Sequence, residues 1–133
     1  MIRHLTALLL ATAALGLAAC GGDDKADAEA TVREFVKATN SRDSKRFCTE
    51  LVTQEFAEQA TGAKGDKARE TCQKQFKSLK GLKLKLVRVE NTRVDGDKAR
   101  VRAVLAIQGQ EQDQLYRLEK EDGSWRLAGG TGG

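Results

Sequence analysis

The stretch that decides the fold is residues 82–107, which read LKLKLVRVENTRVDGDKARVRAVLAI. Apolar and polar residues alternate along it, and Asp95-Gly96 is a dipeptide typical of a tight β-hairpin turn. The pattern therefore predicts two antiparallel strands. The apolar residues are even-numbered as far as Leu86 and odd-numbered just after it, so we expect a β-bulge within residues 87–91 that bends the first strand.

Two further strands follow with the same alternation. Residues 112–120 are predicted to form the third strand, and Asp122-Gly123 turns the chain into a fourth at 124–128. A two-residue turn places Leu118 opposite Leu127 across this hairpin. Its apolar residues then share one face, where we expect them in the core: Tyr116, Leu118, Trp125 and Leu127.

Upstream of the strands, the apolar residues recur at helical spacing. They predict a first helix over residues 26–40. Asp43 can cap a second helix at its N-terminus, and Thr53 can cap a further turn. Asp66 can cap a third helix, which is predicted to end at Gly81.

Three helices followed by an antiparallel four-stranded sheet define an α+β fold, with the helices packed on one face of a curved sheet. The chain has 133 residues and no internal repeat, so it has room for one domain. We place that domain at residues 26–129. The glycine-rich end, residues 130–133, is predicted to be a flexible tail.

The first twenty residues have the character of an export signal. A short positive start at 1–4 precedes an apolar run over 5–19, which is shorter than a membrane-spanning helix needs. The junction Leu17-Ala18-Ala19-Cys20 resembles the lipobox of bacterial lipoproteins. That resemblance implies cleavage before Cys20 and attachment of a diacylglycerol and a further acyl chain, such as palmitate, to it. The alternative is an ordinary secretory signal that is cut at the same place.

The lipoprotein interpretation sets the location of the domain. Residues 1–19 would be removed as the signal peptide, and residues 20–25 would be the lipidated cysteine and a flexible tether. Acyl chains contribute about 0.8 kcal/mol per buried CH₂, so several of them make a durable anchor. We therefore expect a lipid-anchored protein on the extracytoplasmic face of the cell membrane.

The cysteines and the histidine limit which catalytic and metal sites the domain can contain. With Cys20 carrying lipid, Cys48 and Cys72 remain as an even pair in an exported chain, which favours a disulfide over two free thiols or a metal pair. The only histidine, His4, is lost with the signal peptide. This excludes Ser-His and Cys-His nucleophilic pairs and most zinc sites. We expect neither a metal nor a cofactor.

Three stretches, ATVREF at 30–35, FCTEL at 47–51 and KEDGSWRLA at 120–128, together with the order of elements, resemble the nuclear-transport-factor-2-like superfamily in its small bacterial lipoprotein form. The resemblance covers residues 26–129 and implies a cystatin-like cone, in which a bent sheet wraps around helices. Larger members carry a β-hairpin where this chain has only the loop 62–65, which implies a shallow cavity or none. The expected lining of a cavity is Phe35, Leu51, Phe76, Val101, Leu105, Tyr116 and Trp125.

Some enzymes of this superfamily use an Asp base with a Tyr in an apolar cone, and Tyr116 is the only tyrosine here. The candidate carboxylates are Glu90, Asp113 and Glu119. A carboxylate base needs desolvation to raise its pKa towards neutrality, but Glu90 and Asp113 stand among charged or polar neighbours. We therefore expect both to be exposed and the domain not to be an enzyme. An isomerase or dehydratase with a buried carboxylate is the alternative.

A basic stretch leads from the third predicted helix into the first strand, with only Asp66 and Glu70 against it. It could face anionic lipid headgroups or a phosphate-bearing envelope polymer, although a solvated surface is the interpretation that we favour. The formal net charge of +4 is too mild to indicate nucleic-acid binding. The basic residues are Lys64, Lys67, Arg69, Lys74, Lys77, Lys80, Lys83, Lys85 and Arg88.

These observations favour a non-catalytic domain that binds a small apolar ligand or a protein partner. An electrostatic tether in the envelope, with no pocket, is a third hypothesis. The expected partners are the membrane, through the lipid, and an unidentified small ligand or envelope protein, with a homodimer left open.

Overall fold

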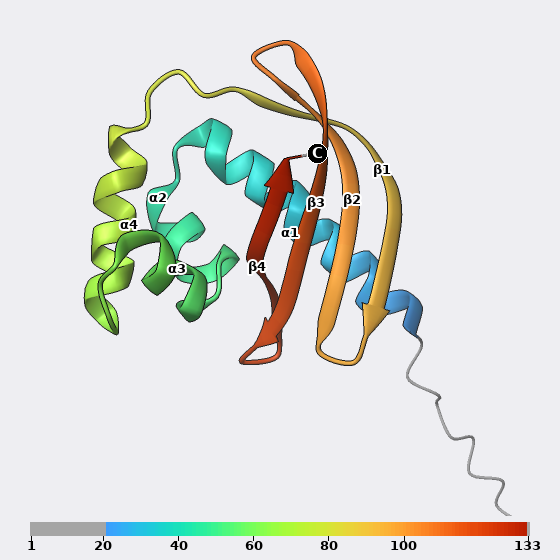
Figure 1. Cartoon of the computed structure of the whole chain (residues 1–133), viewed down its shortest axis with the longest axis horizontal. Helices are drawn as coiled ribbons and strands as arrows, with labels where there is room; N and C mark the ends of the chain where they lie inside the picture. Colours follow the sequence, from blue (N-terminus) through green and yellow to red (C-terminus); the bar gives the residue numbers. More distant parts are fainter. Residues whose placement is uncertain (1–20, 133) are drawn as a thin grey trace, which may run out of the picture.

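The computed structural model describes residues 21–132, so the predicted signal peptide and Cys20 lie outside the described residues. Four helical segments and one π-helical turn come first, and four strands follow (Figure 1). The helical part consists of α1 (Gly21–Ser41), α2 (Ser44–Arg46), the π-helical turn η1 (Phe47–Leu51), α3 (Gln54–Thr61) and α4 (Asp66–Ser78). The strands are β1 (Leu84–Asp95), β2 (Lys98–Ile107), β3 (Gln110–Glu121) and β4 (Ser124–Gly132).

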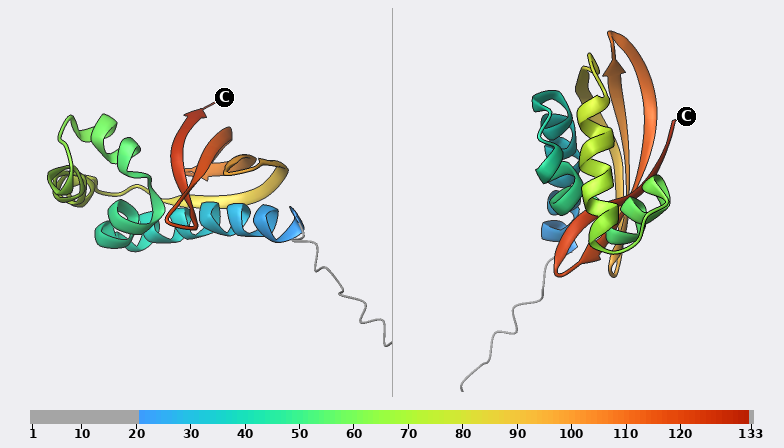
Figure 2. Two further views of the ribbon diagram at one scale, coloured as in Figure 1. Left: turned by 90° about the horizontal axis from the view of Figure 1, so that it is seen from below. Right: turned by 90° about the vertical axis from the view of Figure 1, so that its left-hand side faces the viewer.

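The strands form one antiparallel sheet in the order β1-β2-β3-β4, as the alternating pattern predicted. Register shifts between Leu86 and Arg88 and between Val89 and Asn91 confirm the β-bulge in the first strand. The sheet is curved, and α1 lies along one of its faces (Figures 1 and 2). The α+β fold class is therefore confirmed. Within residues 21–132, no helix combines the length and the apolar character that crossing a bilayer requires.

The main core lies between α1 and the inner face of the sheet. Val32 of α1 is fully buried there, together with Val101 and Leu105 of β2. In the last hairpin Leu118 pairs with Leu127, as the two-residue turn requires. The four residues expected on the inner face of that hairpin are all buried: Tyr116, Leu118, Trp125 and Leu127.

The helical half differs from the prediction in where the helices begin and end. Asp43 accepts a hydrogen bond from the Arg46 N–H and Thr53 accepts one from the Phe56 N–H, so both predicted caps are confirmed. The turn after Thr53 is a separate helix, α3, because Val52 is extended and bridges to β4. Asp66 is not a cap; it is the first residue of α4, which follows Gly65.

Both ends of the described chain are more regular than the sequence predicted. Residues 21–25, expected to be a flexible tether, form the first turn of α1, where Asp23 and Asp24 lie at the positive end of the helix dipole. Asp24 also pairs with Lys120 of β3 at 2.7 Å, which raises the pKa of Lys120 and lowers that of Asp24.

The prediction of a flexible tail is also wrong, because residues 130–132 extend β4 and pair with β3. Gly130 lies opposite Tyr116, and a Cβ at Gly130 would stand 3.5 Å from the tyrosine ring, which is an ordinary van der Waals distance. The glycines therefore form regular strand here, although glycine in a strand usually weakens it.

A disulfide between Cys48 and Cys72 joins η1 to α4, and the Cα atoms of the two cysteines are 5.9 Å apart. This is the pairing that the cysteine count favoured. Both cysteines are buried, and they form a small apolar cluster with Phe76 and Phe47. The bond therefore fixes α4 beside η1, and the groove described next lies against these elements.

Candidate functional site: an apolar groove between the helices and the first strand

All four phenylalanines of the chain line one groove, of about 360 Å³, that opens beside α4. Three of them are in aromatic contact: the ring centroids of Phe35 and Phe47 are 5.5 Å apart, and those of Phe47 and Phe76 are 4.6 Å apart. The lining residues come from α1, η1, α3, α4, the segment that follows α4 and the first residue of β1: Phe35, Thr39, Phe47, Phe56, Ala60, Thr61, Cys72, Gln75, Phe76, Ser78, Leu79, Leu82 and Leu84.

The rim of the groove is formed by the segment between α4 and β1. Leu79 and Leu82 are 57% and 37% exposed, and among residues 21–132 only Val87 is a further exposed large apolar residue. The end of this segment is held in place by Asn40, whose side-chain amide donates to the Leu84 carbonyl at 2.6 Å and whose oxygen accepts from the Leu84 N–H at 2.8 Å. These two hydrogen bonds fix the segment where it enters β1.

The groove contains no titratable lining residue, since Asp, Glu, Lys, Arg and His are all missing from its wall. Its hydroxyl groups are also occupied. Thr39, Thr61 and Ser78 each donate to a carbonyl of their own helix, at 2.8, 2.6 and 2.6 Å. The wall can therefore contact an apolar surface, and it carries no carboxylate, imidazole, amine or guanidinium group.

The predicted cavity residues divide into two groups. Phe35 and Phe76 line the groove. The other five are buried in the packed interior and do not line the groove: Leu51, Val101, Leu105, Tyr116 and Trp125. The groove lies at the side of the domain, where α4 packs against α3, α2 and η1.

The predicted lining did not include most of the residues that form the groove, and five of the missed ones are large and apolar: Phe47, Phe56, Leu79, Leu82 and Leu84. A signal for two of them was present, because Leu79 and Leu82 continue an apolar pattern beyond the point where α4 ends at Ser78. An apolar residue outside a helix or strand has no element to bury it, so it marks either a packed loop or an exposed apolar edge.

The candidate carboxylates do not approach Tyr116. Glu90 is exposed and pairs with Arg88 at 3.1 Å, and Asp113 is exposed as well, which confirms the expected exposure of both. Asp113 and Glu119 alternate with Tyr116 along β3 and therefore lie on the opposite face of the sheet. Burial raises the pKa of Tyr116 to about 12, so its phenol stays protonated at neutral pH.

The basic stretch does not form a single solvent-facing surface. Arg69 is turned inward and pairs with Glu121 at 3.1 Å, with only 15% of its side chain exposed. Lys64 pairs with Glu58 and, at the far end, Arg88 with Glu90. The remaining basic residues of the stretch are exposed: Lys67, Lys74, Lys77, Lys80, Lys83 and Lys85.

The fold is a small α+β domain with a curved four-stranded sheet, and an apolar groove lies at its side. This chain is similar to a domain of unknown function with a cystatin-like fold from Nostoc punctiforme, with 22% sequence identity and a TM-score of 0.54 over 80% of this chain and 76% of that one. This likeness supports the cone-shaped fold that the sequence resemblance implied, and it concerns the fold alone.

Two further solved structures are similar at lower scores. One is a protein of unknown function, described as NTF2-like, from Cytophaga hutchinsonii, with 16% identity and a TM-score of 0.48 over 80% of this chain and 89% of that one. The other is a de novo designed protein with a curved β-sheet, with 20% identity and a TM-score of 0.49 over 79% and 97%. The sequence matches no protein-family model and no curated protein.

Proposed function

We propose that this protein is a lipoprotein of the bacterial envelope whose domain binds a small apolar ligand without transforming it. The observation that carries the proposal is the groove lined by all four phenylalanines and rimmed by the exposed Leu79 and Leu82. Apolar walls with few polar groups are typical of binding sites for small apolar molecules. A wall without ionisable groups supports binding over isomerase or dehydratase chemistry.

The charges around the rim suggest a ligand with an acidic end. Phe76, Leu79 and Leu82 line the groove, and each is followed directly by an exposed lysine: Lys77, Lys80 and Lys83. An acyl chain could lie on the aromatic wall while its acidic head stays at the rim, in water and near these cations. A fatty acid such as dodecanoate is therefore a suitable probe.

We expect Leu79→Glu to weaken binding of dodecanoate or of the neutral dye N-phenyl-1-naphthylamine by about tenfold or more, because the new carboxylate must be desolvated when the ligand binds. Leu79 is exposed, so the variant should fold normally. Fluorescence titration of residues 21–133, prepared without detergent, measures the affinity.

Val87→Glu is the matched control. In the described part of the chain Val87 is the third exposed large apolar residue, and it lies in the bulged part of β1 and does not line the groove. It should bind as the unchanged domain does. Equal weakening by both substitutions, or no saturable binding by the unchanged domain, would contradict the proposal.

The location of the protein has its own test. We expect Cys20→Ser to abolish membrane attachment, because the serine hydroxyl cannot form the thioether bond to diacylglycerol and the acyl chains supply the anchor. Detergent phase partitioning and gel mobility after expression in a bacterial host measure this. The substituted chain should remain unprocessed or leave the membrane fraction, and fractionation like that of wild type would refute lipidation at Cys20.

A further inference from the structure

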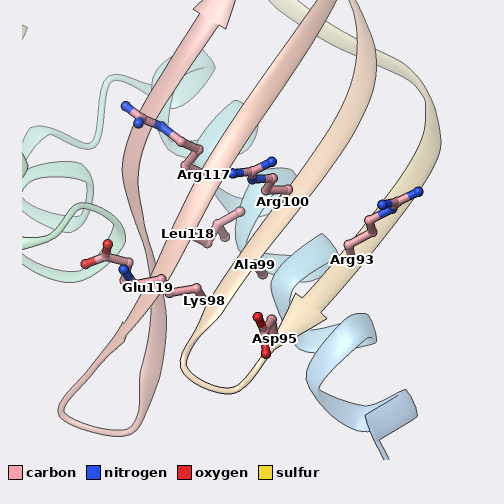
Figure 3. A pocket seen from close by; sticks show the side chains of 8 residues that line it. All are labelled: Arg93, Asp95, Lys98, Ala99, Arg100, Arg117, Leu118 and Glu119. Atoms are coloured by element: carbon pink, nitrogen blue, oxygen red, sulfur yellow. The ribbon is translucent and has the colours of Figure 1, made fainter.

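Three arginines stand side by side on the outer face of the sheet, the face that points away from α1. Arg93 of β1 is paired in register with Arg100 of β2, and Arg100 with Arg117 of β3 (Figure 3). Arg102 lies on the same face, two residues along β2. All four side chains are exposed, and we call them the arginine row.

The arginine row is not neutralised by the protein. Within residues 21–132, no ion pair includes any of its four guanidinium groups. The neighbouring row on the same face alternates in sign, with Asp95 opposite Lys98, Lys98 opposite Glu119, and Glu119 opposite Arg126. Like charges directly opposite each other in a sheet are destabilising. Repulsion between its guanidinium groups therefore destabilises the fold at the arginine row, whereas the neighbouring row pairs opposite charges.

The outer face of the sheet is hollowed beside the arginine row. A hollow of about 470 Å³ is lined by three of these arginines, by the lysine and the two carboxylates of the alternating row, and by two apolar residues: Arg93, Arg100, Arg117, Lys98, Asp95, Glu119, Ala99 and Leu118. Arg117 lies across β4 at Gly129, where a Cβ atom would come within 2.5 Å of its Nη2 atom. The absence of a side chain at Gly129 thus lets the Arg117 guanidinium lie over the neighbouring strand.

From this geometry we propose that the outer face of the sheet binds a linear polyanion that carries repeated phosphate groups. Guanidinium groups bind phosphate oxygens through paired, charge-assisted hydrogen bonds, and bound phosphates would relieve the repulsion within the row. This site is separate from the apolar groove, because none of its residues lines the groove.

The spread of the side chains selects a linear ligand over a single phosphate. The guanidinium of Arg117 points towards β4, that of Arg93 points away on the β1 side, and Arg100 lies between them (Figure 3). Neighbouring strands are about 4.8 Å apart, so the row extends roughly 10 Å across the sheet. The three groups do not converge on one point, whereas successive phosphates of a chain can each meet one arginine.

The test uses the full chain in a nonionic detergent and three probes: linear inorganic polyphosphate, inorganic phosphate, and dihexanoyl phosphatidylglycerol below its micelle concentration. We expect polyphosphate to bind best and to lose affinity as salt rises, because its counterions are released on binding. Arg100→Gln should weaken that binding by about tenfold, the value of a lost charge-assisted contact. Isothermal calorimetry measures each affinity.

Arg33→Gln is the matched control, since Arg33 is an exposed arginine on α1 and the charge change is the same. It should bind polyphosphate as wild type does. Arg100→Gln should be at least as heat-stable as wild type, because it relieves like-charge repulsion, so lost binding cannot be ascribed to misfolding. Absence of polyphosphate binding, equal weakening by both substitutions, or equal or tighter binding of inorganic phosphate or of the short-chain lipid would each overturn the proposal.

Discussion

Replacing Cys48 and Cys72 with alanine is expected to lower the free energy of unfolding by about 3 kcal/mol. The bond joins residues 24 positions apart, and a cross-link of that length restricts the unfolded chain by an amount of this order. That is a large part of the 5 to 15 kcal/mol by which folded domains are usually stable. Alanine is chosen because both sites are buried, where serine would add an unsatisfied hydroxyl.

Urea unfolding followed by the fluorescence of Trp125, the only tryptophan and a buried one, measures the loss. Wild-type protein in a reducing buffer should lose a similar amount, which separates the bond from the change in side-chain packing. Since the bond also holds α4 beside the groove, the alanine variant should bind dodecanoate more weakly. A loss below about 1 kcal/mol would show that the cross-link contributes little to stability.

Arg69→Met is expected to cost about 2 to 3 kcal/mol, because it leaves polar partners without a hydrogen bond in a mostly buried place. The Arg69 guanidinium donates to the Cys48 carbonyl, to the Val52 carbonyl at 3.0 Å and to the Gln54 side chain at 2.8 Å. It also binds Glu121 of β3 at 3.1 Å. One side chain thus ties α4 to η1, α3 and the sheet.

Methionine retains the apolar stem of Arg69, so the loss would report mainly on the polar contacts. Arg33→Met is the control, because its ion pair with Glu29 is long, at 3.9 Å, and exposed, and such pairs contribute little. Glu121 keeps its ion pair with Arg126 at 3.3 Å and its hydrogen bond from the Gln54 N–H at 2.8 Å, so the loss should come mainly from the Cys48 and Val52 carbonyls. A cost equal to that of the control would mean that the network does not stabilise the domain.

The sheet was predictable because its signals are local. Alternation, the two Asp-Gly turns and the change of parity after Leu86 each act within a few residues, and the register and the bulge follow from them. The caps at Asp43 and Thr53 are local in the same way. The disulfide was predictable from the number of cysteines, because only two remain after Cys20 is assigned to lipid.

The site was less predictable because its residues meet only in the folded chain. Arg69 stands in a run of basic residues and looks solvated, but its partner Glu121 is 52 positions away. The groove gathers side chains from α1, η1, α3, α4, the segment after α4 and the first residue of β1, whereas the cavity was expected between the helices and strands β2, β3 and β4. The pairing of residues 130–132 was hidden by their glycines, which have no side chain to show a pattern.

The most direct test of the account is to map where an apolar ligand binds. Residues 21–133, labelled at their leucine and valine methyl groups, would be titrated with dodecanoate and followed by NMR. We expect the methyl signals of Leu79, Leu82 and Leu84 to shift in a saturable way, while those of the buried Val101 and Leu105 and of the exposed Val87 stay unchanged. Saturable shifts confined to residues outside the groove, or no shifts at all, would contradict the assignment of the groove as the binding site.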